Sequence, residues 1–185
     1  TNKTPPPPPS HYYGLGLTYE IGNLSLAGIV ERFDNKSEED KNKATMVYSL
    51  SATYDFEVAK AFFGYQYANR FHTLDQLEDV WVSGKGMNQN AFTLGAEAGG
   101  TFKVAANYGF GKVKSADGVV VDDTKLSNDK FNRFTVGAAY EYPLSKRTFV
   151  YGWSAYATAG KMFKEKAVEE NFKSWSLGLG LHHTF

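Results

Sequence analysis

The side chains that could perform chemistry are few in this 185-residue chain, and they form no recognisable catalytic or metal-binding motif. Cysteine is absent, which excludes thiol catalysis, disulfides and thiolate metal sites. His182 and His183 are neighbours, but adjacent strand residues point to opposite faces and cannot chelate one ion together. The Gly-Phe-Gly-Lys segment at 109–112 lacks the second half of a phosphate-binding loop. The sequence therefore predicts no catalytic residues, no cofactor and no metal site, so the chain is not expected to be an enzyme.

The end of the chain carries the most informative pattern. Trp175, Leu177, Leu179 and Leu181 alternate with serine, glycine and histidine residues, which predicts a strand with one apolar and one polar face. A soluble protein with so apolar an edge strand would aggregate, whereas lipid covers such a face in an outer-membrane barrel. The fold class predicted is therefore all-β, a transmembrane antiparallel β-barrel in the bacterial outer membrane.

Nine alternating segments follow one another over residues 12–185, and short turns and long loops join them in strict alternation. Outer-membrane barrels show this asymmetry, with short periplasmic turns and longer outer loops. The mean hydropathy is only −0.41, because half of each strand of a barrel faces water. Aromatic residues near strand ends are expected at the membrane interfaces, among them Trp175 and the terminal Phe185. The eighth segment is predicted to direct the following residues to lipid: Phe149, Tyr151, Trp153, Ala155 and Ala157.

The opposite parity is polar, and we expect it to line the interior. Its members are Glu20, Glu31, Lys60, Gln66, Arg70, Glu97, Lys103, Asn107, Arg133, Glu141 and His182. In a wide barrel, lysine and arginine on this wall would favour anions and the glutamates would oppose them. The same charges could instead pair as wall salt bridges that are worth little in water. The pore-lining residues predicted are Glu20, Glu31, Lys60, Arg70, Glu97, Lys103, Arg133 and His182.

The number of strands raises a question of closure. Nine strands cannot close as an antiparallel ring, because the first and the last run in the same direction. We therefore expect residues 12–185 to be part of a barrel that is completed by an odd number of further strands. Residues 1–11, with five consecutive prolines, would be an exposed segment at an outer loop, where the chain was cut. The alternative is an eight-stranded barrel from residue 24 onward, with residues 12–21 as a periplasmic lead-in and a structural or adhesion role.

Three segments resemble the C-terminal half of the trimeric general porins of β-proteobacteria. They are GLGLTYEIGNLSL at 14–26, YEYPLSKRT at 140–148 and GLGLHHTF at 178–185. The resemblance implies a sixteen-stranded, homotrimeric barrel that passes small hydrophilic solutes and ions by passive diffusion. A missing N-terminal fragment would supply seven strands and the loop that constricts the pore, and Phe185 would be the aromatic residue that the assembly machinery uses. The proline run and His183 depart from the family pattern.

Charge composition bears on the partners. The formal net charge is zero, so no nucleic-acid partner is indicated. The partners expected are outer-membrane lipid and lipopolysaccharide. Acidic loop residues could bridge divalent ions to lipopolysaccharide or could simply be solvated: Glu38, Glu39, Asp40, Asp122 and Asp123.

Overall fold

The computed structural model describes residues 11–34, 44–71, 73–74, 77–81, 86–114, 120–121, 124–125, 129–164 and 173–184. Its main feature is one nine-stranded antiparallel sheet. In their order across the sheet the strands are β1 (His11–Ile21), β2 (Leu24–Asp34), β3 (Thr45–Asp55), β4 (Ala59–Phe71), β7 (Met87–Ala98), β8 (Phe102–Val113), β11 (Lys130–Ser145), β12 (Thr148–Lys161) and β13 (Lys173–His183). The predicted number of strands and their antiparallel arrangement are confirmed.

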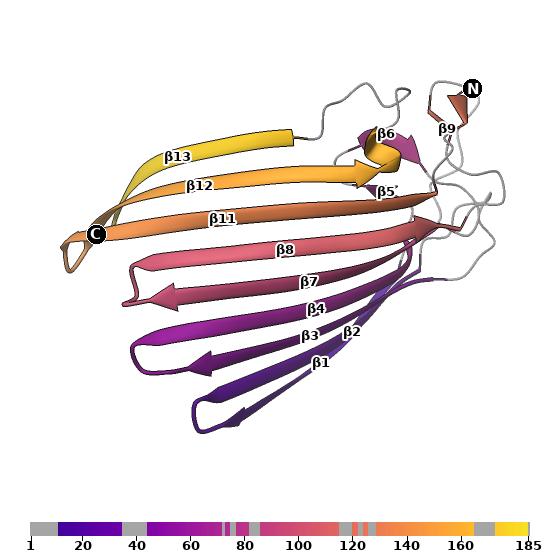
Figure 1. Ribbon diagram of the computed structural model, residues 1–185. Coiled ribbons are helices and arrows are strands. Elements are labelled where there is room, and N and C mark those ends of the chain that lie inside the picture. Colours follow the sequence, from indigo (N-terminus) through magenta and orange to yellow (C-terminus); the bar gives the residue numbers. More distant parts are fainter. Residues whose placement is uncertain are drawn as a thin grey trace, which may run out of the picture.

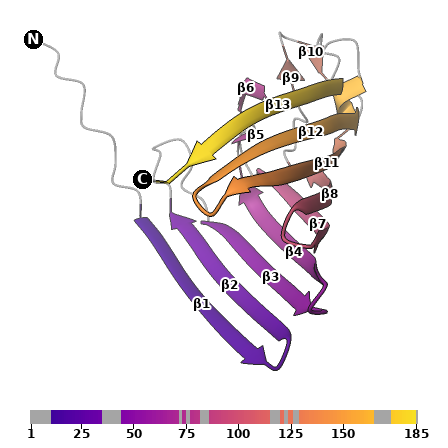
Figure 2. The ribbon, with the colours of Figure 1, turned by 90° about the vertical axis from the view of Figure 1, so that its left-hand side faces the viewer.

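The connections follow the predicted alternation. Short turns join β1 to β2, β3 to β4, β7 to β8 and β11 to β12, and the longer connections all lie at the other end of the sheet (Figure 1). Two small ribbons, β5 (Thr73–Leu74) with β6 (Leu77–Trp81) and β9 (Val120–Val121) with β10 (Thr124–Lys125), and a 3-10 turn, η1 (Met162–Lys164), belong to these connections. Figure 2 shows that the sheet is bent into an open arc. Among the described residues no helix is long and apolar enough to cross a membrane.

β1 is a full member of the sheet. Each of its residues pairs with β2, from His11 opposite Asp34 to Ile21 opposite Leu24. Residues 12–21 are therefore a paired strand, which speaks against their role as a periplasmic lead-in. β1 and β13 form the two edges of the sheet. The Pro-rich segment lies outside the described residues, except for His11 at the start of β1.

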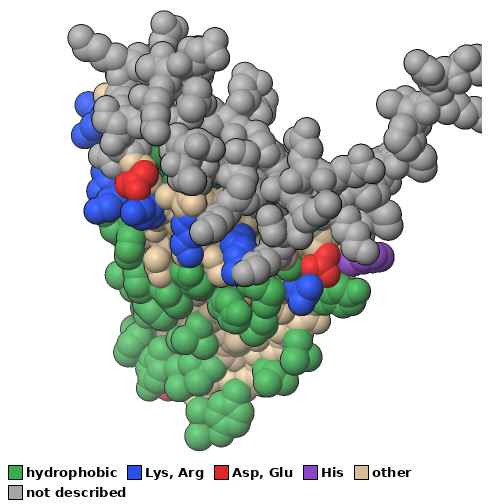
Figure 3. All heavy atoms as spheres, turned by 90° about the vertical axis from the view of Figure 1, so that its right-hand side faces the viewer, with side chains coloured by type: hydrophobic (Ala, Val, Ile, Leu, Met, Phe, Trp, Pro, Cys, Tyr) green, Lys and Arg blue, Asp and Glu red, His purple; other side chains and the backbone are tan. Residues whose placement is uncertain are grey.

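The pairing register divides the sheet into an apolar and a polar face. On the apolar face Leu17 pairs with Gly28, and Gly28 pairs with Leu50. Large hydrophobic side chains on this face are strongly exposed, for example 74% for Leu17 and 85% for Leu179. Hydrophobic side chains cover most of the described surface in the view of Figure 3, and charged side chains gather beside the grey residues. Such a continuous apolar surface requires a hydrocarbon environment.

Close packing is confined to the end of the sheet that carries the long connections. The most deeply buried side chains there are Met87, Val113, Phe131 and Met162. The rings of Phe71 and Phe131 meet edge to face, with centroids 6.4 Å apart. The rest of the sheet is one layer thick, so its side chains reach either face without a core.

The prediction of which residues of β12 face lipid is wrong. The register places Val150, Gly152 and Ser154 of β12 on the apolar face, opposite Leu181, Leu179 and Leu177 of β13. The residues predicted to face lipid there lie on the polar face instead: Phe149, Tyr151, Trp153, Ala155 and Ala157. The reason is that glycines of β13 leave room for two of these rings. A Cβ added to Gly178 would collide with the indole of Trp153, and one added to Gly180 with the ring of Tyr151.

Candidate pore-lining face

A row of alternating charges crosses the polar face near the short turns. This charge ladder consists of Asp55, Lys60, Glu97, Lys103 and Glu141, one residue each from β3, β4, β7, β8 and β11. Neighbouring strands present opposite signs because the register sets Lys60 beside Asp55 and Glu97, and Glu97 beside Lys103. Five signs in the order minus, plus, minus, plus, minus leave one net negative charge.

The two lysines of the charge ladder form ion pairs. Lys60 Nζ lies 3.4 Å from Asp55 Oδ2, and Lys103 Nζ lies 2.7 Å from Glu141 Oε1. The four side chains are 31% to 48% exposed. At this exposure each pair contributes about 0–1 kcal/mol to stability. For Lys60 and Lys103 the structure therefore favours the wall salt bridge over the free cation.

Beside the charge ladder, the wall is lined by small residues. Gly95, Ala105, Gly137 and Ala155 face one another across four strands. They line a depression of about 590 Å³. Because these residues carry at most a methyl group, the wall recedes here by about the length of a longer side chain.

Side-chain hydrogen bonds occupy the polar face farther from the short turns. Asn107 Nδ2 donates to Thr93 Oγ1 (2.8 Å), and Gln66 Nε2 donates to Ser49 Oγ (3.2 Å). Tyr12 donates its hydroxyl proton to Glu31 Oε1 at 2.9 Å. Together with the charge ladder, these bonds give the face a hydrophilic surface that water can wet.

Arg133 differs from the two lysines. It lies on the polar face of β11, with Gly109 and Ala159 as its cross-strand neighbours. Within the part of the chain that the structure describes, the ion pairs do not include Arg133. Its charge is therefore not compensated locally by a described carboxylate.

The remaining predicted site residues are distributed as follows. Glu20 and Glu31 lie on the polar face of β1 and β2, opposite Ser25 and Gly14. Arg70 occupies a bulge in β4 with a φ of 61°, so it is outside the strict alternation of the strand. That these residues and His182 line a pore remains a prediction.

The sequence also predicted opposite faces for His182 and His183, and positions at the membrane interfaces for Trp175 and Phe185. His182 and His183 point to opposite faces: the ring of His182 stacks on Phe149 (4.8 Å), whereas His183 Nδ1 is 2.8 Å from Thr148 Oγ1. Trp175 is 77% exposed on the apolar face, at the end of β13 near the long connections. Phe185 and the acidic loop clusters lie outside the described residues.

Tyr151 and Trp153 are wall residues that the sequence interpretation missed. Both lie over glycines of β13 on the polar face. An aromatic ring that covers a cross-strand glycine is a known way of stabilising a sheet. The sequence does contain a pattern that could have indicated this: two aromatic residues spaced by two on β12 and two glycines spaced by two on β13.

Charged residues at the loop end bound the apolar face. Arg32 Nε lies 2.9 Å from Asp34 Oδ1, and Lys112 Nζ lies 2.9 Å from Asp129 Oδ2. The hydrogen bond from Lys112 is the main reason that the pKa of Asp129 lies below its ordinary value. These pairs mark where the hydrocarbon-facing surface ends.

Comparison with known proteins agrees with this architecture. Residues 6–161 match the family described as Gram-negative porin. An outer membrane porin protein of Bordetella pertussis is 28% identical over 92% of this chain and 45% of its own length. The anion-selective porin from Comamonas acidovorans superposes with a TM-score of 0.56 at 22% identity, over 94% of this chain and 49% of its own.

The outer-membrane expressed OmpT of Vibrio cholerae superposes with a TM-score of 0.60 at 12% identity, over 94% of this chain and 56% of its own. The chain thus spans about half the length of the relatives it matches. The predicted porin resemblance, the transmembrane β-barrel fold and the location in the bacterial outer membrane are confirmed. The chain belongs to the Gram-negative porin family.

Proposed function

We propose that this chain forms about half of the wall of a water-filled diffusion channel for small hydrophilic solutes and ions. The observation that carries the proposal is the two-sided sheet: large hydrophobic residues are exposed on one face, and the charge ladder lies on the other. A barrel wall needs lipid outside and water inside, and this division supplies both. The chemistry is passive, with no bond made or broken, so we do not assign an enzymatic activity.

The open sheet supports a barrel with further strands. β1 and β13 run in the same direction, because they are the first and ninth strands of an antiparallel order. An antiparallel seam between them requires an odd number of added strands. Seven strands from a second segment of polypeptide give the sixteen that the family resemblance implies, and we propose a homotrimer of such barrels. Lipopolysaccharide would contact the charged loop end near Arg32 and Lys112.

Within this channel the polar-face residues set the local field. We assign the ion-paired charge ladder a structural role in the wall, and Arg133 a role in attracting anions. The depression beside the ladder keeps the lumen wide at that level. Glu20 and Glu31 would oppose Arg133 from strands on the other side of the sheet.

Thiol modification tests which face meets the lumen. Thr135 lies on the polar face of β11 and Val136 on its apolar face. In planar bilayers, protein purified from outer membranes should form stable channels, and a charged methanethiosulfonate reagent should lower the conductance of Thr135→Cys. The matched variant Val136→Cys should keep its conductance. Absence of channels, or equal sensitivity of both variants, would contradict the proposal.

A further inference from the structure

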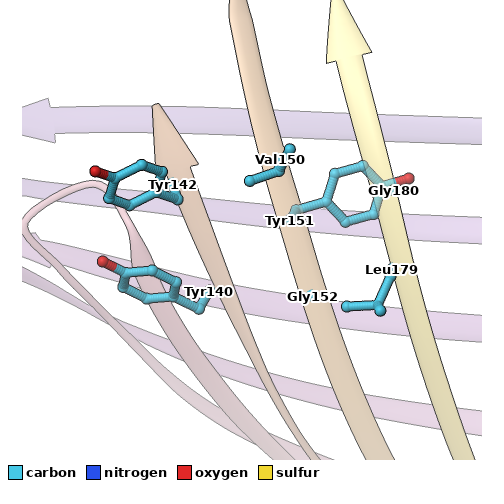
Figure 4. Close-up of a pocket in the computed structure, with 7 residues that line it drawn as sticks. All are labelled: Tyr140, Tyr142, Val150, Tyr151, Gly152, Leu179 and Gly180. Carbon is cyan, nitrogen blue, oxygen red and sulfur yellow. The ribbon is translucent and has the colours of Figure 1, made fainter. Parts of the chain in front are cut away.

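A groove runs along the apolar face over β12. Its flanks are Tyr140 and Tyr142 of β11 on one side and Leu179 of β13 on the other, and its floor is Val150 and Gly152 (Figure 4). Tyr151 and Gly180, a cross-strand pair of the polar face, complete the lining. The groove has a volume of about 620 Å³. It exists because β12 directs Phe149, Tyr151 and Trp153 to the polar face and leaves Val150, Gly152 and Ser154 on the apolar one.

The groove opens onto a longer stretch of the apolar face of β12. Its lining on β12 covers Val150 to Gly152. Beyond the groove, the apolar face of β12 continues through Ser154 to Tyr156, whose ring is 5.1 Å from that of Trp175. At about 3.3 Å per residue, six steps from Val150 to Tyr156 measure about 20 Å. The hydrocarbon of one leaflet is about 15 Å thick. An acyl chain that enters from the short-turn side can therefore lie in the groove and continue over Ser154 toward Tyr156.

Positive charge lies at the open end of the groove. The turn between β11 and β12 contains Lys146 and Arg147, both exposed. The described apolar-face positions at this end carry no carboxylate: Leu144, Thr148 and His183. Each of the other three short turns is either uncharged or, at Glu57, acidic. The cations are therefore found at the one described short turn that adjoins the groove.

We infer that this groove binds one phospholipid with an anionic headgroup from the leaflet next to the short turns. One acyl chain lies on Val150 and Gly152 between the tyrosines and Leu179, and the phosphate is held by Lys146 and Arg147. Juxtamembrane cations attract anionic headgroups with about 1 kcal/mol each, which is about fivefold in affinity. The inference depends on the membrane location of the apolar face but not on the proposed conductance.

Two kinds of variant separate chain binding from headgroup binding. Gly152→Leu fills the floor, because a Cβ there already lies 3.0 Å from the flexible Cδ2 of Leu179. Gly28→Leu is the matched control, since it adds the same side chain to the same face where nothing lies within 4 Å. Lys146→Gln and Arg147→Gln remove the cations, and Lys173→Gln, at the opposite end of β13, is their control.

Native mass spectrometry of the detergent-purified protein measures the result, with dioleoyl phosphatidylglycerol and dioleoyl phosphatidylcholine as probes. We expect the wild type to retain phosphatidylglycerol preferentially, the two charge variants together to lose about 30-fold in affinity for it, and Gly152→Leu to lose both lipids. Both controls should bind as the wild type does.

Equal binding of the two lipids by the wild type would overturn the inference. So would phosphatidylglycerol binding that survives Gly152→Leu. If Gly152→Leu dissociates the oligomer and leaves lipid binding unchanged, the groove is a contact between copies of the protein, and the inference is also wrong. Channel conductance measured on the same variants keeps this outcome separate from failure of the proposed function.

Discussion

Exchange of one residue for arginine on either face of β13 tests which side of the sheet meets lipid. Leu177 lies on the apolar face opposite Ser154 and is 79% exposed. It is four residues from the start of β13 at Lys173 and six from its end, so it is close to the middle of the membrane. The adjacent Ser176 lies on the polar face opposite Ala155. The pair differs by one position along the strand and in the face that it occupies.

The expected loss of stability follows from the depth of residue 177 in the membrane. Arginine on the lipid face of a barrel near the midplane costs about 2–4 kcal/mol, which lowers the folding equilibrium constant roughly 30- to 900-fold for Leu177→Arg. Arginine at 176 would extend into water on the polar face, and a solvated substitution of this kind changes stability by about 0.5 kcal/mol or less.

Folding of the urea-unfolded protein into lipid vesicles measures the difference. The folded fraction is read from the heat-modifiable band on a gel, over a range of urea concentrations. Leu177→Arg should shift the folding midpoint to lower urea, and Ser176→Arg should fold as the wild type does. The reverse order, or equal loss in both variants, would refute the assignment of the two faces.

Three further predictions concern single sites. Arg133→Glu changes the local charge by two units, which at ~10 Å in water is worth about 0.8 kcal/mol and so roughly fourfold in the local ratio of anions to cations. The reversal potential in a dilute KCl gradient should move toward cation preference. An unchanged potential would exclude Arg133 from the ion path. Gly178→Val should destabilise the protein by about 1–3 kcal/mol through overpacking against Trp153, and Trp153→Ala should relieve that loss in a double-mutant cycle; additive effects would contradict the contact. The bond from Lys112 lowers the pKa of Asp129 from its ordinary 3.8, so the pair stabilises the protein above that pH and loses this effect as the pH falls through the lowered value. The difference in urea midpoint between wild type and Asp129→Asn should therefore be present at pH 7 and vanish in strong acid, whereas a difference that persists there would exclude the ion pair as its cause.

Much of the fold follows from local pattern. Leu15 and Leu17 on β1 and Leu177 and Leu179 on β13 alternate with small or polar residues, and this period of two is sufficient to predict strands in a lipid environment. Turn signals such as Gly99-Gly100, where both residues have positive φ, set the hairpins.

The parity of β12 could not be derived from that strand alone. Both of its faces carry aromatic or aliphatic residues, so hydrophobicity does not choose between them. The choice depends on Gly178 and Gly180, which accept the rings of Trp153 and Tyr151 from the neighbouring strand. A contact between strands decided what a single-strand pattern left ambiguous.

Prediction of the candidate pore-lining face from the sequence meets the same limit, because contacts between strands cannot be derived from one strand. The charged residues of the polar face were identified from parity, but their pairing required the register. Glu141 is 38 residues from Lys103 along the chain and 2.7 Å away in space. The bulge at Arg70 likewise removes that residue from the alternation, and nothing in the local composition marked it.

The common direction of β1 and β13 restricts how copies of this sheet can associate. A two-fold pairing of β1 with β1 of another copy would be antiparallel, but it would send the long connections of the two copies to opposite sides of the bilayer. Head-to-tail joining of β13 to the next β1 would give a parallel seam within an antiparallel ring. The geometry thus disfavours both homotypic barrels and extended ribbons built from this sheet alone.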